Sequence, residues 1–197
     1  MAKSGRPQDA FGDKAKKDGF AARSVYKLEE IDRRTQLFRR GMRVLDMGAF
    51  PGSWTQYAAQ RVGPEGRVLA VDQQEWRGSF APHVETRQCD VLALAPTDVG
   101  GLASFDIVLS DMAPWTTGVR FVDQSRSCEL YLHALAIAEG TLRASGSFIG
   151  KIFQGRDFDQ AKKRTEALFT KTRVMKPDAS RKESYEIFVI ATGFRGD

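Results

Sequence analysis

Cysteine and histidine are scarce in this chain, and their scarcity excludes two kinds of site. The 197 residues include only 2 cysteines and 2 histidines. Cys89 and Cys128 lie far apart in the sequence, so we expect two free thiols in a reducing compartment and no disulfide framework. With so few thiol and imidazole ligands, we expect neither a zinc site nor any other metal.

Long apolar runs are missing as well. No segment approaches the roughly eighteen consecutive apolar residues that a membrane-spanning helix needs. The N-terminal stretch MAKSGRPQDAFGDKAKK has no apolar segment typical of a secretory signal, and its Asp9 and Asp13 argue against a mitochondrial transit peptide. Apolar residues nevertheless make up 42% of the chain, enough for the core of one domain. We therefore expect a cytoplasmic protein that does not bind a membrane. We also expect a monomer, although no feature of the sequence determines the oligomeric state.

The net charge of +5 is unevenly distributed along the chain. Residues 1–43 hold 12 Lys and Arg against 6 Asp and Glu, and residues 151–197 hold 11 against 7. The middle of the chain is acidic, since residues 44–150 hold 7 Lys and Arg against 12 Asp and Glu. Basic ends favour a polyanionic partner such as a nucleic acid, whereas the alternative is an ordinary solvated surface.

Strand-like and helix-like segments alternate from residue 43 onward. The expected strands are 43–48, 67–72, 84–90, 105–111, 146–153, 173–176 and 184–192, and the expected helices are 20–38, 53–61, 127–143 and 157–170. This alternation predicts an α/β fold in which helices cover both faces of a mostly parallel sheet. We divide the chain into a basic polar arm (1–19) and one domain (20–197), which comprises a basic helix (20–42) and a Rossmann-like core (43–197).

The loop after the first expected strand reads LDMGAFPGSW and is typical of a nucleotide-type cofactor site. Gly48 and Gly52 permit a tight turn close to a ligand, and the next helix begins near Ser53. Asp72 ends the second strand and is placed to bind the hydroxyls of an adenosine ribose. The spacing differs from Gly-x-Gly-x-x-Gly, and Asp46 would repel a pyrophosphate, so S-adenosylmethionine fits better than a dinucleotide. The alternative is a structural turn with ordinary surface acids.

Four charged residues stand where apolar ones are expected. Lys151 lies inside the run GSFIGKIF, Glu186 lies inside SYEIFVIAT, and Asp111 ends the most apolar strand. Lys27 recurs with Arg23 and Arg34 on one side of the first long helix. For each residue alone, a buried ion pair or an exposed strand edge is the simpler explanation; together they favour a polar cluster at the strand ends.

Such a cluster suits methylation of a ribose 2'-hydroxyl. The enzyme must align oxygen, methyl carbon and sulfur and must remove the hydroxyl proton. A lysine accepts a proton only in its neutral form, which Lys27 would favour for Lys151 and which Asp111 and Glu186 would oppose. The sequence leaves two roles open for Lys151, that of a base and that of a group that orients the hydroxyl.

The motifs as a set resemble those of a known family. ARSVYKLEEID (22–32), LDMGAFPGSW (45–54), LAVD (69–72), LSDMAP (109–114), GSFIGKIFQG (146–155), LFTKTRVMKPDASR (168–181) and EIFVIATG (186–193) follow in order. The chain is therefore identified as similar to the RlmE/FtsJ (RrmJ) ribose 2'-O-methyltransferases over nearly its whole length.

The resemblance implies a fold, a reaction and a set of site residues. The fold is a Rossmann-like S-adenosylmethionine-dependent methyltransferase fold with a seven-stranded, mostly parallel sheet whose last-formed strand is antiparallel. The family's Lys-Asp-Lys-Glu catalytic set falls on Lys27, Asp111, Lys151 and Glu186, with Lys151 as base or orienting residue. Together with the loop reading, it gives the cofactor set Asp46, Gly48, Gly52, Ser53, Trp54, Asp72, Asp90 and Asp111.

The implied substrate is RNA. Bacterial members of the family methylate a uridine ribose in the A loop of 23S rRNA within the large (50S) ribosomal subunit, and related enzymes methylate tRNA. Residues expected to hold RNA phosphates are Lys14, Lys16, Lys17, Arg23, Arg33, Arg34 and Lys182. The chain departs from the family pattern at Phe50, Ser53 and residues 115–127, which lie in the loop and beside the expected RNA entrance.

Two other classes of function remain at this point. A non-catalytic RNA-binding factor for ribosome assembly would need the basic ends but not the four charged residues. A nicotinamide-dependent oxidoreductase would need Gly-x-Gly-x-x-Gly and a Tyr-x-x-x-Lys pair, and the sequence contains neither.

Overall fold

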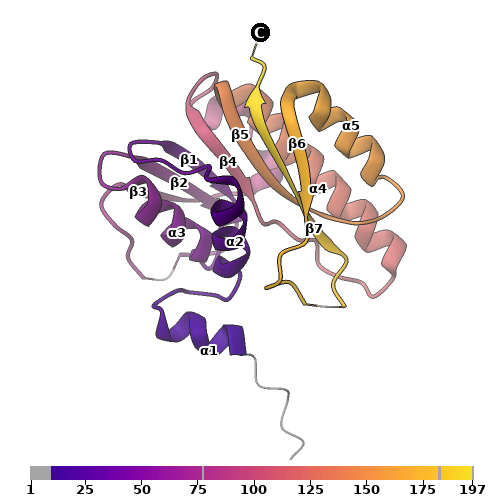
Figure 1. Cartoon of the computed structure of the whole chain (residues 1–197), viewed down its shortest axis with the longest axis horizontal. Helices are drawn as coiled ribbons and strands as arrows, with labels where there is room; N and C mark the ends of the chain where they lie inside the picture. The colour runs from indigo at the N-terminus through magenta and orange to yellow at the C-terminus, as the bar shows by residue number, and fades with distance from the viewer. Residues whose placement is uncertain (1–9, 77, 182, 197) are drawn as a thin grey trace, which may run out of the picture.

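The computed structural model describes residues 10–76, 78–181 and 183–196, which form one seven-stranded sheet flanked by helices (Figure 1). The sheet has the order β3-β2-β1-β4-β5-β7-β6. The strands are β1 Arg43–Met47, β2 Arg67–Asp72, β3 Val84–Gln88, β4 Phe105–Ser110, β5 Leu142–Phe153, β6 Phe169–Met175 and β7 Glu186–Phe194. Strands β1 to β5 pair in parallel, and β7 is antiparallel to both β5 and β6. The expected α/β fold, with a reversed last strand, is confirmed.

Two hydrophobic layers hold helices on opposite faces of the sheet. The helices are α1 Ala10–Lys17, α2 Val25–Thr35, α3 Ser53–Val62, α4 Arg120–Thr141 and α5 Phe158–Leu168, with short 3-10 turns at Val91–Ala93 and Pro96–Val99. In β4, Ile107 and Leu109 pack into the layer under α2 and α3, whereas Val108 packs into the layer under α4 and α5. All six residues of β4 are buried, as expected for a central strand covered on both sides.

The last third of the chain departs from the expected element boundaries. We expected a helix to continue to residue 170, but α5 ends at Leu168 and β6 begins at Phe169. The Phe169 ring is 2% exposed and lies 5.4 Å from the ring of Phe194, its partner in β7. Strand pairing and ring packing from the tertiary structure therefore outweigh the local helical pattern.

Helix α4 begins earlier than the sequence pattern indicates. We expected it from residue 127, and it begins at Arg120. Its first turns, RFVDQSR, are mostly polar and carry little apolar periodicity, so the pattern reveals only the buried second half. The early start places residues 120 and 121 beside the carboxyl ends of β4 and β5.

Part of the stretch expected as a polar arm is helical. Ala15 of α1 packs with Val25, Tyr26 and Ala179, and the Tyr26 hydroxyl donates a 2.8 Å hydrogen bond to Asp18. Helix α1 therefore lies against the base of α2. Residues 1–9 of the expected arm lie outside the described residues.

The reversed strand decides where the site forms. Because β7 is antiparallel to β5, its first residue, Glu186, pairs with Phe153 at the end of β5. The start of β7 and the carboxyl ends of the parallel strands thus meet at one edge of the sheet, the lower edge in Figure 1, near α1. Ligands of open α/β sheets bind at this edge. Among the described helices, none is long and apolar enough to cross a membrane.

Candidate active site

The four charged residues from separate elements come together as two ion pairs. Lys27 of α2 places its Nζ 2.6 Å from Oε1 of Glu186, the first residue of β7. Lys151 of β5 places its Nζ 3.0 Å from Oδ1 of Asp111, and it donates a 2.6 Å hydrogen bond to the backbone oxygen of Asp111. The side chains of Lys151 and Glu186 are 6% and 11% exposed, so this cluster is nearly removed from water.

The two pairs form one electrostatic cluster around Phe188. Lys151 lies opposite Phe188 in the β5–β7 register, and Nζ of Lys27 lies 5.7 Å from the centre of the Phe188 ring. Burial alone would raise the pKa of Glu186, but Lys27, together with the more distant charge of Lys151, lowers it below the ordinary value. Glu186 is therefore held as a carboxylate that fixes the ammonium of Lys27.

Lys151 makes one hydrogen bond within the described residues, which leaves positions on its nitrogen for a substrate group. A neutral amine carries two hydrogens and one lone pair, and an ammonium carries three hydrogens. One hydrogen is donated to the backbone oxygen of Asp111, and the carboxylate Oδ1 of Asp111 lies 3.0 Å from the nitrogen as an ion-pair partner without a hydrogen bond. Of the two remaining positions, one is a lone pair in the neutral form, and both are N–H groups in the charged form. Either one can hold a hydroxyl that approaches this edge, and only the lone pair can accept its proton.

A hollow of about 390 Å³ adjoins Asp111 and contains half of the expected cofactor set. Gly48, Asp72, Asp90 and Asp111 line it. Gly48 has a φ of +69°, and a Cβ at this position would collide with the side chain of Met112. The Asp72 carboxylate accepts hydrogen bonds from the backbone N–H groups of residues 50 and 74 at 2.9 and 2.8 Å, which fixes the glycine loop against the strand end.

Three other expected cofactor residues, Gly52, Ser53 and Trp54, lie at the start of α3 and outside the lining of the hollow. Gly52 has a φ of +106° at the start of α3. The Ser53 hydroxyl lies 2.7 Å from that of Ser24, and the indole N–H of Trp54 donates to the Ser24 backbone oxygen at 2.8 Å. These three residues are not among those that line the hollow. In this structure Ser53 and Trp54 join α3 to the start of α2.

Asp46 is completely enclosed beneath the loop. Its Oδ2 accepts a 2.7 Å hydrogen bond from the Thr55 hydroxyl, and its Oδ1 has no hydrogen-bond partner among the described residues. Burial raises the pKa of Asp46 to about 7; the Thr55 hydrogen bond opposes this shift, and the nearby carboxylates of Asp111 and Asp72 add to it. The folded protein therefore binds a proton here between about pH 4 and pH 7 that the unfolded chain does not bind.

This proton predicts a pH-dependent effect of Asp46→Asn. Because the folded-state pKa lies above 3.8, the wild-type protein loses stability as pH rises toward 7, whereas asparagine does not titrate. The difference in free energy of unfolding, variant minus wild type, should increase by roughly 2 to 3 kcal/mol between pH 5 and pH 8. Urea unfolding at both pH values measures it. Thr55→Val removes the hydrogen bond that lowers the pKa and should steepen the pH dependence; equal slopes for all three proteins would contradict the assignment.

Several residues that line the hollow escaped the sequence reasoning. Beyond the expected set, the lining consists of Phe50, Gln73, Gln74, Val91, Leu92, Met112, Ala113, Pro114, Trp115 and Leu130. Most follow directly after Asp72, Asp90 or Asp111, the acids that end their strands. The available signal was therefore positional, since residues just beyond the carboxyl ends of parallel strands face the same crevice.

The basic stripe on α2 is largely used inside the molecule. Arg23 donates a 2.8 Å hydrogen bond to the backbone oxygen of Ala179, and Arg34 pairs with Glu30 at 2.6 Å and lies 3.9 Å from Asp178. With the Lys27–Glu186 pair, these contacts attach α2 to the segment that precedes β7. These contacts hold α2 so that Lys27 reaches the site. They also engage Arg23 and Arg34 within the protein, so the stripe presents less positive charge to an RNA than the sequence indicates.

The remaining residues expected to contact RNA lie on the surface. Lys16, Lys17 and Arg33 are exposed, and Lys14 is exposed but paired with Asp18 at 2.6 Å. The expected residue Lys182 lies outside the described residues. A smaller hollow of about 270 Å³ is lined by Arg23, Lys27, Arg181 and Glu186, and thus includes the Lys27–Glu186 pair.

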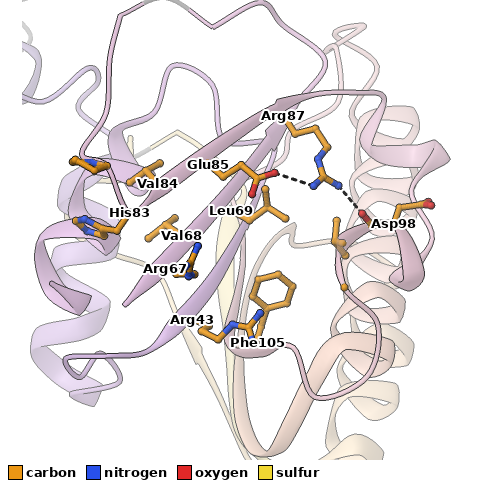
Figure 2. Close-up of a pocket in the computed structure, with 13 residues that line it drawn as sticks. Arg43, Arg67, Val68, Leu69, His83, Val84, Glu85, Arg87, Asp98 and Phe105 are labelled. Atoms are coloured by element: carbon orange, nitrogen blue, oxygen red, sulfur yellow. Dashed lines mark hydrogen bonds and ion pairs between the residues drawn. The ribbon is translucent and has the colours of Figure 1, made fainter. Parts of the chain in front are cut away.

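A larger hollow of about 580 Å³ opens at the opposite edge of the sheet. Figure 2 shows Arg43, Arg67, Val84 and Phe105, the first residues of four strands, lining it. Arg87 there is paired with Glu85 at 2.9 Å. None of the residues expected in the site lines this hollow. Although this hollow is larger, it is not the candidate cofactor site, because the charged cluster lies at the other ends of the strands. In the described part of the chain, no group of three or more His, Cys, Asp or Glu residues could hold a metal.

The sheet with one reversed strand, the glycine loop and the acids at the strand ends define a Rossmann-like methyltransferase. The chain belongs to the FtsJ-like methyltransferase family, whose model matches residues 20–194. This assignment confirms the resemblance seen in the motifs.

The curated relatives agree with the family, and a solved structure agrees with the fold. The chain is 49% identical over 193 residues to ribosomal RNA large subunit methyltransferase E of Nitratidesulfovibrio vulgaris (strain DSM 19637 / Miyazaki F), covering 96% of each chain. It is 48% identical to the protein of that name from Sorangium cellulosum (strain So ce56), covering 92% of this chain and 86% of the relative. A crystal structure described as a ribosomal RNA methyltransferase from Plasmodium falciparum has a TM-score of 0.77 at 24% identity, covering 90% of this chain and 100% of that one, and supports the fold.

Proposed function

We propose that the protein methylates RNA of the large ribosomal subunit at a ribose 2'-hydroxyl, with S-adenosylmethionine as methyl donor. The acceptor is a uridine in the A loop of 23S rRNA, presented by the 50S subunit. The observation that carries this proposal is the buried pairing of Lys151 with Asp111, at the edge of a hollow lined by the acids of the cofactor set. The relatives named ribosomal RNA large subunit methyltransferase E support the substrate class.

The hollow suits S-adenosylmethionine in size and in chemistry. Its volume of about 390 Å³ lies within the range usual for small-ligand sites. Asp72 would hold the ribose hydroxyls and Asp90 the adenine, while the negative charge of Asp111 suits a sulfonium cation. The bound cofactor supplies an electrophilic methyl group. Among the described residues, a pyrophosphate would meet several carboxylates here and no basic lining residue, which disfavours a dinucleotide.

A ligand-stabilisation experiment tests this cofactor assignment. A ligand that binds only the folded state raises the melting temperature in proportion to the logarithm of its concentration above its Kd. S-adenosylhomocysteine should therefore raise the melting temperature of the protein and NAD should not. Asp90→Ala should reduce the shift, whereas Arg87→Ala, at the opposite hollow, should retain it. Stabilisation by NAD alone would overturn the methyltransferase assignment for this chain.

The residues of the cluster divide the remaining chemical work. Lys151 receives the acceptor hydroxyl on a position of its nitrogen that is not used by the backbone oxygen of Asp111, and it takes the hydroxyl proton, or orients the hydroxyl lone pair, as methyl transfer proceeds. Asp111 fixes Lys151 from two directions, and Glu186 fixes Lys27 beside Phe188. Burial of these groups excludes water from the reacting oxygen. The contribution of the protein is therefore chiefly position and proton transfer.

The acceptor side lies next to the Lys27–Glu186 pair. The hollow of about 270 Å³ is lined by Arg23 and Arg181, whose guanidinium groups suit a phosphate of the target nucleotide. The exposed residues Lys16, Lys17 and Arg33 extend the positive charge outward for a larger RNA. A purely non-catalytic assembly factor would need only this charge and not the buried cluster.

A further inference from the structure

Exposed aromatic residues gather around the catalytic edge. Trp115 is 84% exposed, Phe121 is 52% exposed and Tyr185 is 47% exposed. They come from the loop after β4, the first turn of α4 and the residue before Glu186, so segments far apart in the sequence contribute to one region. Single exposed apolar side chains are ordinary, but a group of them at a functional edge indicates a binding surface. We refer to Trp115, Phe121 and Tyr185, with Arg120 and Arg156, as the aromatic rim.

Two of these rings carry an arginine on their face. The guanidinium carbon of Arg120 lies 4.1 Å from the centre of the Tyr185 ring, and that of Arg156 lies 4.8 Å from the centre of the Phe121 ring. Stacked guanidinium and aromatic planes are the surfaces on which unpaired nucleobases stack, and the positive charge attracts the adjoining phosphates. A protein partner would need apolar contacts but no such alternation.

The rim adjoins both halves of the catalytic cluster. Trp115 lines the same hollow as Asp111. Tyr185 precedes Glu186, and its backbone oxygen accepts a 2.9 Å hydrogen bond from the N–H of Gln154. A base held on the rim therefore lies beside the nucleotide whose ribose reaches Lys151.

The loop that carries Trp115 is fixed in place. The carboxylate of Asp123 accepts hydrogen bonds from the N–H and hydroxyl of Thr117 at 2.8 and 2.9 Å and from the N–H of Gly118 at 3.2 Å. The Thr117 N–H bond is the largest cause of the lowered pKa of Asp123, so the carboxylate remains charged. These hydrogen bonds fix the loop that follows Trp115, so the exposed indole is preorganised for a ligand.

We propose that the aromatic rim stacks unpaired bases that flank the target nucleotide, so that the acceptor is a looped-out segment and not a duplex. This inference rests on the proposed function. The Lys151 side chain is only 6% exposed, and a ribose within a stacked A-form helix cannot reach so enclosed a nitrogen. The nucleotide must leave its stack, and the rim replaces part of the stacking that it loses.

Steady-state methylation with Trp115 variants tests the proposal. Trp115→Ala should raise the KM for RNA about 5- to 100-fold and change kcat at saturating RNA by less than about 3-fold. Trp115→Phe, which keeps an aromatic face, should recover most of the KM, whereas Trp115→Leu should not. Leu102→Ala is the matched control, because Leu102 is 69% exposed but lies near the start of β4, at the other edge. Because Trp115 also lines the cofactor hollow, the KM for RNA is measured at saturating S-adenosylmethionine; Phe121→Ala and Leu102→Ala, which lie outside that hollow, should keep the S-adenosylhomocysteine melting shift.

Binding measured by tryptophan emission separates this inference from the proposed function. Of the three tryptophans, Trp115 is exposed, Trp76 is half-buried and Trp54 is 2% exposed. A single-stranded RNA oligonucleotide should quench the emission that Trp115→Phe removes, and a blunt duplex of equal length should not. Quenching without methylation of any RNA would overturn the proposed function and retain the rim. Methylation that depends on Lys151 but is as efficient in Trp115→Ala as in Leu102→Ala, without quenching, would overturn the rim. Loss of 50S binding alone, with naked RNA unaffected, would also overturn it, because the rim would then dock a protein.

Discussion

Lys151→Ala is expected to lower the rate of methyl transfer by about 100- to 10,000-fold, the range usual for loss of a general base or acid. The variant removes the nitrogen that donates to the backbone oxygen of Asp111 and lies 3.0 Å from its carboxylate. The melting shift with S-adenosylhomocysteine should persist, because Lys151 does not line the cofactor hollow. Single-turnover methylation at saturating RNA and cofactor measures the chemical step.

Lys151→Arg separates the two roles of this residue. Arginine retains a charged N–H donor, but it does not lose a proton in proteins and so cannot act as a base. If Lys151 accepts the proton, Lys151→Arg should be as inactive as Lys151→Ala. Recovery of a large part of the rate by arginine would assign Lys151 to orientation of the hydroxyl. Wild-type activity in Lys151→Ala would contradict both roles.

The second large effect concerns stability. Lys27→Met leaves the Glu186 carboxylate, whose side chain is 11% exposed, without its partner 2.6 Å away. Removing one member of a buried pair costs about 3 to 5 kcal/mol in free energy of unfolding, and replacing both members by apolar residues is often nearly neutral. We therefore expect Lys27→Met to be strongly destabilised and Lys27→Met with Glu186→Leu to recover most of the loss. Urea unfolding of wild type, Lys27→Met, Glu186→Leu and the double variant gives the coupling directly.

An exposed pair serves as the control for this cycle. Lys162 and Glu166 on α5 are also 2.6 Å apart, but their side chains are 35% and 44% exposed, so breaking them should cost less than about 1 kcal/mol. The pH dependence gives a further check. Because the pKa of Glu186 is lowered from 4.5 in the folded state, its stabilising contribution is present above pH 4.5 and is lost as pH falls below that value. A single variant as stable as the double variant would contradict the pairing.

The fold could be predicted well where burial follows a simple period. β4 and β7 are dense apolar runs, because central strands are covered on both faces and exclude most polar residues. The end of β2 at Asp72 also matches the expectation. The start of α4 and the boundary between α5 and β6 could not be predicted, because Arg120 and Phe169 take their conformations from tertiary contacts. Helix propensity and local period do not contain that information.

The candidate site was predictable in part for the same reason. A lysine inside β5 and a glutamate inside β7 conflict with their apolar surroundings, and such conflicts mark functional positions. The sequence could not show that Trp54 joins α3 to α2, that Asp46 is enclosed, or that Arg23 and Arg34 are engaged with the segment before β7. Those facts depend on how elements pack, whereas the motif gives only their order along the chain.

The most direct test of the account is to map ribose 2'-O-methylation after incubating undermethylated 50S subunits, naked 23S rRNA and bulk tRNA with S-adenosylmethionine and either wild type or Lys151→Ala. We expect a new 2'-O-methyl group at an A-loop uridine of 23S rRNA in the 50S subunit, with wild type only. Methyl transfer to tRNA would keep the chemistry and replace the target. Equal methylation by Lys151→Ala, or methylation of a base instead of a ribose, would contradict the central claim that the Lys151 cluster acts on a 2'-hydroxyl.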